Sequence, residues 1–277
     1  MKTKDLKLKF FLNEAILFLG IQFFALLCGL KLLIRPEVQV YIKESSFSWF
    51  SFLAGFFIAT IFIFLILKFS RSIIPPRLLF ALLIFIGSFL VLGIYFNNKI
   101  ALIFSFLIVF LRFIWPYVIV QNISIILAII GSAVFLGLSI EVWHLIPILV
   151  ILPFYDVIAV YKTKHMVFMF KRLMRAGAIF ALIIPLEAKG YLKNLKELAP
   201  GEKFIFLGTG DLAFPIIFAI SALKIKFISA ILVILGAFLG LCFIHFFFLR
   251  QEERKPIPAL PPIAIGAISG FLISLVI

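Results

Sequence analysis

Long apolar runs, separated by short basic or proline-containing breaks, dominate the hydrophobic pattern of this chain. The runs are about twenty residues long, which is enough for a helix to cross a hydrocarbon core of roughly 30 Å. Backbone groups in lipid must hydrogen-bond within their own segment, so continuous apolar runs favour helices, whereas barrel strands alternate apolar and polar residues. We therefore expect an all-α membrane protein with about nine transmembrane helices. The expected helices are residues 10–33, 47–67, 78–96, 100–114, 119–140, 142–161, 203–223, 227–249 and 258–277.

Composition agrees with a chain that lies mostly in lipid, since 65% of its residues are hydrophobic and 14% are charged. The net charge of +14 comes from lysines and arginines that gather in alternate breaks, chiefly residues 1–9, 68–77 and 162–203. Basic residues favour the cytoplasmic side, so we expect a cytoplasmic N-terminus, an external C-terminus and a location in the cell membrane. The charge is then a topology signal and a contact with the lipid surface, not a nucleic-acid site.

The chain divides into three parts on this interpretation. Residues 1–161 form the first six helices, residues 162–202 form a cytoplasmic loop, and residues 203–277 form the last three helices. The loop contains an apolar stretch, Ala176–Leu186, that is too short to cross a membrane and follows several basic residues. We expect this stretch to be an amphipathic segment at the interface and not a tenth span.

Two of the acidic side chains, Asp156 and Asp211, fall deep inside apolar runs. A carboxylate near the middle of a membrane costs roughly 2.5–3.5 kcal/mol on insertion scales, so these two residues indicate a function, a pairing or both. Glu14 lies near the inner end of the first expected helix, and we expect it to reach the interface.

The positions of the two aspartates predict that they meet. Asp156 precedes Lys162 by six residues, a depth of about 9 Å at the helical rise, and Asp211 follows Lys203 by eight, about 12 Å. The loop 162–202 joins these helix ends on one side of the membrane, so both carboxylates lie at similar depth on antiparallel neighbours. Two adjacent carboxylic acids share one proton, which is the arrangement that aspartic proteases use to activate water and polarise a carbonyl.

The residues around the acids suit a loosened, accessible backbone. Glycines in Gly208-Thr209-Gly210-Asp211 allow another chain to approach the second acid, and Pro215 frees the carbonyl of Asp211 from the helix ladder. Pro153 loosens the other helix one turn before Asp156. The prolines of residues 256–262 exclude interior helix, so this segment must enter the membrane extended, against protein or a wet cavity.

Three motifs carry a resemblance to the presenilin and signal peptide peptidase family of GxGD intramembrane aspartyl proteases. Tyr155-Asp156, Gly208-Thr209-Gly210-Asp211 and Pro258-Ala259-Leu260 are similar, in order, to its YD, GxGD and PAL motifs. The similarity covers about half the chain, from the sixth to the ninth expected helix, and the short loops resemble an archaeal-type homologue.

The resemblance implies a nine-span fold that cleaves transmembrane helices of other proteins, with Asp156 and Asp211 as the catalytic acids. It also implies that Pro258-Ala259-Leu260 shapes the active site and the substrate strand. The expected orientation resembles presenilin, whereas Leu212-Ala213-Phe214-Pro215 resembles the peptidase branch. Thr209 stands where many relatives carry an apolar residue, which leaves the substrate preference open. The implied partners are transmembrane substrates and the lipid bilayer, with no nucleic acid, no metal and no cofactor.

Other interpretations of the same residues remain. The aspartates can serve as a polar lock between two helices, and the glycines as packing residues. A prepilin-peptidase-like enzyme also uses a GxGD acid, and an ion or proton pathway also places acids in the membrane. His144, His165 and His245 share no metal-ligand spacing, and we expect His245 to face the inner interface.

Overall fold

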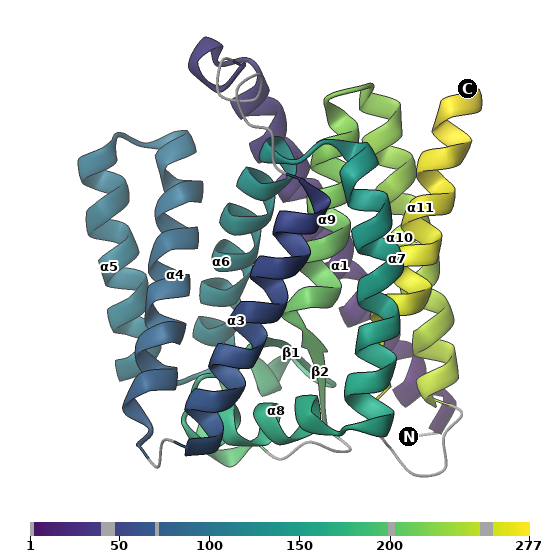
Figure 1. The fold of residues 1–277 in the computed structure, drawn as a ribbon. Coiled ribbons are helices and arrows are strands. Elements are labelled where there is room, and N and C mark those ends of the chain that lie inside the picture. Colours follow the sequence, from purple (N-terminus) through teal and green to yellow (C-terminus); the bar gives the residue numbers. More distant parts are fainter. Residues whose placement is uncertain (1–2, 40–47, 70–71, 199–202, 250–256) are drawn as a thin grey trace.

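The computed structural model describes residues 3–39, 48–69, 72–198, 203–249 and 257–277, and it shows a bundle of long helices standing side by side (Figure 1). The main helices are α1 (Thr3–Leu33), α3 (Trp49–Phe69), α4 (Ile74–Tyr95), α5 (Asn98–Ile114), α6 (Val118–Ser139), α7 (Val142–Val157), α8 (His165–Arg175), α9 (Thr209–Leu223), α10 (Phe227–Leu249) and α11 (Leu260–Val276). Every apolar run that predicts a spanning helix overlaps one of these helices.

Six helices in the described ranges are long and apolar enough to cross a membrane. They comprise α1, α3, α4, α6, α10, and α7 together with the π-helical turn Ile158–Lys162 that continues it. Helices α9 and α11 are apolar but shorter. The chain is therefore an integral membrane protein by length and composition of its helices, and the count of nine spans stays a prediction.

Helix α9 is the centre of the bundle and packs against α1, α6, α7, α10 and α11. From Pro215 to Leu223 every residue of α9 is buried. Helices α10 and α11 approach each other through facing glycines, where a Cβ added to Gly266 would lie 2.1 Å from the carbonyl oxygen of Gly236. Small residues allow this backbone contact in lipid, where no hydrophobic force draws helices together.

A two-stranded antiparallel sheet interrupts the helical architecture near the lower end of the bundle (Figure 1). Strand β1 (Ala181–Pro185) pairs with β2 (Phe204–Gly208), with Ala181 opposite Gly208 and Pro185 opposite Phe204. The sheet packs against α1 and α6 and leads directly into α9.

The sheet corrects two sequence expectations. The stretch Ala176–Leu186 is not amphipathic, because all five residues of β1 are buried, and it forms a strand and not a spanning helix. The seventh apolar run is not one helix from residue 203. Its first residues form strand β2, and α9 begins only at Thr209. An apolar run buried on both faces has no alternation, so periodicity cannot separate such a strand from a helix.

Side-chain amides from α6 occupy the outer edge of β1. Asn122 Nδ2 donates to the Ile183 carbonyl over 2.7 Å, and the Ile183 amide donates to Asn122 Oδ1 over 2.9 Å. Gln121 Nε2 donates to the carbonyl of Ile179 over 2.7 Å, and the Arg112 Nε donates to Gln121 Oε1 over 2.5 Å. These hydrogen bonds satisfy the backbone N–H and C=O groups on the edge of β1 that faces away from β2, where another strand would otherwise be needed.

We expect Asn122→Ala to destabilise the protein by roughly 2–4 kcal/mol, because it leaves the N–H and C=O of fully buried Ile183 without partners. The measurement is thermal unfolding in detergent. Ser124→Ala is the matched control. Ser124 lies two residues further along α6, and its hydroxyl donates to the carbonyl of Val120 in the same helix. Equal melting temperatures for the two variants would contradict the edge-sealing role of Asn122.

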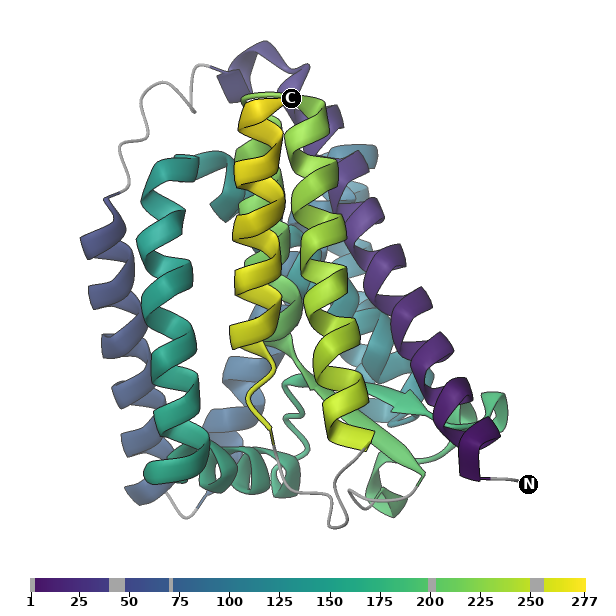
Figure 2. The same ribbon diagram turned by 90° about the vertical axis from the view of Figure 1, so that its right-hand side faces the viewer.

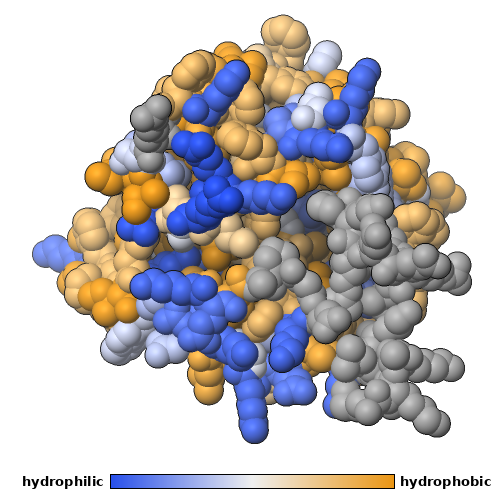
Figure 3. Space-filling model, turned by 90° about the horizontal axis from the view of Figure 1, so that it is seen from below, coloured by the Kyte–Doolittle hydropathy of each residue, from blue (hydrophilic) through white to orange (hydrophobic). Residues whose placement is uncertain are grey.

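The two ends of the bundle differ. Helix α1 begins at the lower end and α11 finishes at the upper end (Figure 2), so the chain enters and leaves on opposite sides of the bundle. Helix α8 lies across the lower end and has no buried side chain, with Arg172 and Arg175 in its last turn. Seen from below, hydrophilic side chains gather over this end, between apolar groups (Figure 3).

Candidate active site

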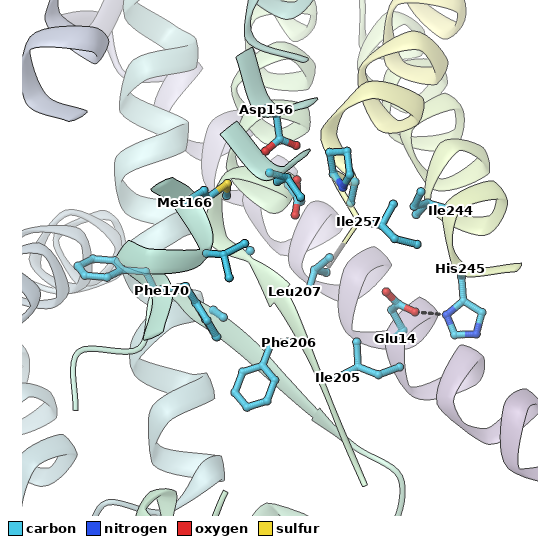
Figure 4. A pocket seen from close by; sticks show the side chains of 18 of the residues that line it. Glu14, Asp156, Met166, Phe170, Ile205, Phe206, Leu207, Ile244, His245 and Ile257 are labelled. Atoms are coloured by element: carbon cyan, nitrogen blue, oxygen red, sulfur yellow. Dashed lines mark hydrogen bonds and ion pairs between the residues drawn. The ribbon is translucent and has the colours of Figure 1, made fainter. Parts of the chain in front are cut away.

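A cavity of about 350 Å³ opens near the lower end of the bundle, and its walls combine residues that are distant in sequence. Both aspartates line it, together with Gly208, Pro258 and Ala259. All five residues of β2 also line it, so the sheet forms one wall. Figure 4 shows Asp156 pointing into the cavity from the end of α7. The structure thus brings together residues from all three sequence motifs.

Asp211 sits in the first turn of α9, where the chain changes from strand to helix. Gly208 is the N-cap residue, and the Asp211 carboxylate reaches back to its backbone amide, as in a capping box. A Cβ added to Gly208 would lie 3.0 Å from Asp211 Oδ2. Glycine at this position therefore leaves room for the carboxylate against the backbone, at the positive end of a helix dipole.

Asp156 occupies the last turn of α7, just before the helix loosens into the π-helical turn Ile158–Lys162. Pro153 precedes it by three residues inside the helix. The backbone amide of Leu260 lies within hydrogen-bonding reach of the Asp156 carboxylate. Because Leu260 is the first residue of α11, this aspartate also faces the N-terminus of a helix.

The two carboxylates are close enough to interact electrostatically across the cavity. Asp156 is 8% exposed, whereas Asp211 is partly exposed because it faces the open space. Each acid lies beside a backbone N–H at a helix start. This geometry places two carboxylic acids around one cavity.

The proline-rich segment reaches the acids as an irregular chain. Residues 257–259 are not helical, and Pro261 and Pro262 then occupy the first turn of α11, where a missing N–H costs nothing. Pro258 and Leu260 are buried, whereas Ala259 is partly exposed to the cavity. The segment is therefore irregular up to α11 and not extended throughout, because Ala259 already has right-handed helical dihedral angles; residues 250–256 lie outside the described ranges.

Other residues of the motifs do not line the cavity. Thr209 and Gly210 belong to α9 behind Asp211, and Leu260 contributes its backbone amide but not its side chain. The Tyr155 side chain packs edge-on against Phe56 and Phe57 of α3.

The Tyr155 hydroxyl ties the end of α7 to α8 through His165, at 2.8 Å from its Nε2. Burial lowers the pKa of His165, which favours a neutral ring that accepts the hydroxyl proton. Thr163 Oγ1 lies 2.6 Å from the other ring nitrogen. Tyr155 therefore fixes the helix end that carries Asp156.

Strand β2 keeps one edge towards the cavity. The Leu186 amide donates to the Lys203 carbonyl and the Thr209 amide donates to the Phe180 carbonyl, so alternate pairs of the ladder are hydrogen-bonded. By this alternation, the backbone groups of Phe204 and Phe206 point away from β1. Within the described ranges β2 pairs with no other strand.

Two further polar residues of the cavity, Glu14 and His245, are not part of any sequence motif. They are buried and form a hydrogen-bonded pair between α1 and α10, which corrects the expectation that both reach the inner interface. Their depth was a usable signal: Glu14 follows Lys9 by five residues and His245 precedes Arg250 by five. The depth comparison places the two residues at one level of the bundle, but it does not make them neighbours, because no single connection joins α1 to α10.

No group of three or more histidine, cysteine, aspartate or glutamate side chains in the described part of the chain is arranged to hold a metal ion. The free thiols Cys28 and Cys242 lie apart from the cavity lining.

Comparisons with known proteins give one family and one fold. A family model described as "Signal-peptide peptidase, presenilin aspartyl protease" matches residues 15–277. One similar solved structure, of a presenilin family intramembrane aspartate protease in space group C222, is 21% identical, with a TM-score of 0.61 and 95% of each chain covered. Another, in space group P2, is 19% identical with a TM-score of 0.60, covering 93% of this chain and 96% of its own. No curated protein sequence matches this chain significantly.

Proposed function

Because the chain belongs to the signal-peptide peptidase and presenilin aspartyl protease family, whose members are aspartic-type endopeptidases, we propose that it hydrolyses peptide bonds within or near transmembrane helices of other membrane proteins. In this proposal Asp156 and Asp211 are the catalytic pair. The observation that carries it is the shared cavity, which both carboxylates line beside the first residues of a helix.

The two acids divide the chemistry of hydrolysis between them. One ionised carboxylate takes a proton from water as its oxygen attacks the carbonyl carbon of the scissile bond, and the protonated partner donates a hydrogen bond to the carbonyl oxygen. The C–N bond then breaks, and the proton passes to the leaving amine. Water is the only co-reactant, so the cycle returns both acids to their starting states.

Strand β2 supplies a place for the substrate. A peptide bond in a helix is shielded, so the substrate must be extended at the cut, and an extended chain can add to an open strand edge. The free edge of β2 faces the cavity and ends at Gly208, beside the Asp211 carboxylate. A strand bound there passes the catalytic pair.

The remaining motif residues act on the shape of the site in this proposal. Pro258 and Ala259 line the cavity together with β2, and the backbone amide of Leu260 lies near Asp156. Gly208 makes room for Asp211, while Thr209 and Gly210 start α9. Tyr155 positions the end of α7 through His165.

We also propose the topology of nine spans in the cell membrane, with a cytoplasmic N-terminus and an external C-terminus. The basic ends of α3, α8 and the start of α1 lie on one side of the bundle, and the end of α11 lies on the other. Residues 1–161 then carry the first acid, residues 162–202 the cytoplasmic connection, and residues 203–277 the second acid.

Single reporter cysteines test this orientation. In a background where Cys28 and Cys242 are replaced by alanine, we expect a membrane-impermeant maleimide to label Ile277→Cys on intact cells, and Lys4→Cys only after the membrane is opened. Labelling of both sites on intact cells would contradict an odd number of spans. The reverse pattern would contradict the orientation.

A cleavage assay tests the activity itself. Purified protein in liposomes, mixed with a single-span substrate, should yield fragments whose masses place the cut inside the apolar span. A transition-state-mimicking aspartyl protease inhibitor should stop it. Cuts confined to a soluble basic leader would indicate a prepilin-peptidase-like enzyme instead. Ion flux without any proteolysis of a broad substrate panel would indicate an ion pathway.

A further inference from the structure

The cavity has a second polar end, opposite the aspartates, that the hydrolytic chemistry does not use. Glu14 of α1 and His245 of α10 form this end, and they are 5% and 3% exposed. Figure 4 shows the two side chains joined across the base of the cavity, with the apolar side chains of Ile205, Ile244 and Ile257 near them. A buried carboxylate and imidazole thus border an apolar channel that leads to Asp156 and Asp211.

The pair is incomplete as a hydrogen-bonded unit. The Glu14 carboxylate engages Nδ1 of His245, but Nε2 of the same ring is buried and finds no partner in the part of the chain that the structure describes. An unmade hydrogen bond at a buried nitrogen costs about 1–3 kcal/mol. Because Nδ1 and Nε2 point in nearly opposite directions from the ring, Nε2 lies on the side away from Glu14.

Among the described residues, the Glu14 carboxylate pairs with His245 and with no lysine or arginine. One oxygen of this carboxylate engages His245, and Figure 4 shows the other oxygen directed into the cavity, near apolar side chains. A buried charge of this kind is stabilised best by an opposite charge with hydrogen-bond donors.

The position of the pair fits a particular part of a bound substrate. Ile205, next to the pair in Figure 4, precedes Gly208 by three residues, which is about 10 Å along a strand. A substrate strand on β2 therefore places a side chain near Glu14 and His245 about three residues from the scissile bond. That side chain lies towards the lower end, where transmembrane segments carry their cytoplasmic lysines and arginines.

We propose that Glu14 and His245 form a subsite that binds a cationic side chain, lysine or arginine, about three residues from the scissile bond on the cytoplasmic side. The inference rests on the proposed function and adds to it a rule for where the cut falls. The ammonium or guanidinium group donates to the cavity-facing oxygen of the Glu14 carboxylate, while His245 holds the other oxygen. The basic end of the substrate helix then anchors in the cavity and sets the register on β2.

The test measures substrate preference, which a purely structural clamp between α1 and α10 does not set. A host transmembrane peptide carries lysine, leucine or glutamate at each of positions two to five from the mapped cut, and kcat/KM is measured for each. We expect the wild type to prefer lysine over leucine by about tenfold at one or two adjacent positions, and to disfavour glutamate. In Glu14→Gln and His245→Gln the lysine-to-leucine ratio should fall towards one.

Ser229→Ala is the matched control, because it removes a buried hydrogen bond to Ser274 at the opposite end of α10 and should leave the ratio unchanged. A second comparison needs no enzyme variant. Acetyllysine keeps the length of lysine without its charge, so the wild type should treat it like leucine.

A wild-type ratio near one at every position, equal rates for lysine and acetyllysine, or an unchanged ratio in Glu14→Gln would each overturn the subsite. These outcomes require that the wild type cleaves the leucine peptide. If the wild type cleaves no peptide of the series, the proposed function itself is contradicted.

Discussion

Asp156→Asn and Asp211→Asn will each lower the rate of intramembrane cleavage by roughly a thousandfold or more, and neither will unfold the protein. The rate falls because an amide can neither take a proton from water nor donate an acidic proton to the carbonyl oxygen. The fold persists because asparagine has the size of aspartate. Its side-chain oxygen can also accept a hydrogen bond from the backbone N–H of Leu260 or Gly208. It also removes the repulsion between two neighbouring carboxylates.

The measurement combines single-turnover cleavage with thermal unfolding of the same preparations. Melting temperatures should stay within about 4 °C of the wild type, which corresponds to about 1 kcal/mol for a chain of this size. Glu141→Gln is the matched control, since it makes the same acid-to-amide change at the exposed N-cap of α7, the helix that ends near Asp156. Cleavage of the same bond by either asparagine variant at a rate near that of Glu141→Gln would exclude that acid from catalysis.

The meeting of the aspartates was predictable because depth in a membrane can be counted along a helix. Asp156 and Asp211 lie at similar distances from basic residues on the two sides of one connection, and the structure places both in one cavity. The glycines and prolines near them were equally informative, since Gly208 faces Asp211 and the prolines after Ala259 begin α11. The positions of glycine and proline therefore predicted the local backbone geometry around both acids.

The sheet was not predictable from the same pattern. Ala181–Pro185 and Phe204–Gly208 are short apolar runs, and each is compatible with a strand, a buried helix or an interfacial segment. What decides between them is tertiary: Asn122 and Gln121 on α6 bind the outer edge of β1, and β2 completes the pair. Those partners are about sixty residues away in sequence, where periodicity carries no information.

The pairing of Glu14 with His245 was missed for a related reason. A single acid one turn inside a helix end can reach the interface, and a single histidine in an apolar run carries no spacing signal. Only the packing of α1 against α10 brings the two together and buries them. The functional assignment of a polar residue in lipid thus depends on its neighbour across the bundle.

Phe206→Pro will reduce kcat/KM for transmembrane substrates by roughly ten- to a hundredfold while the protein stays folded. Phe206 directs its backbone N–H to the free edge of β2, so proline removes a donor that a substrate strand requires and places a ring in its path. One lost ladder bond at about 1 kcal/mol, together with the steric conflict between the ring and the substrate strand, accounts for a change of this size. The fold tolerates the change because proline fits an edge strand whose N–H faces outward.

Two neighbouring variants separate the backbone from the side chain. Phe206→Ala loses the ring that packs against Phe170 but keeps the N–H, so it should retain most of the activity. Ile205→Pro loses an N–H that the alternation directs to β1, so it should lower the melting temperature instead. If Phe206→Pro and Phe206→Ala cleave equally well, the substrate does not use the edge of β2. The position of β2 beside Asp211 would then serve only to hold the start of α9.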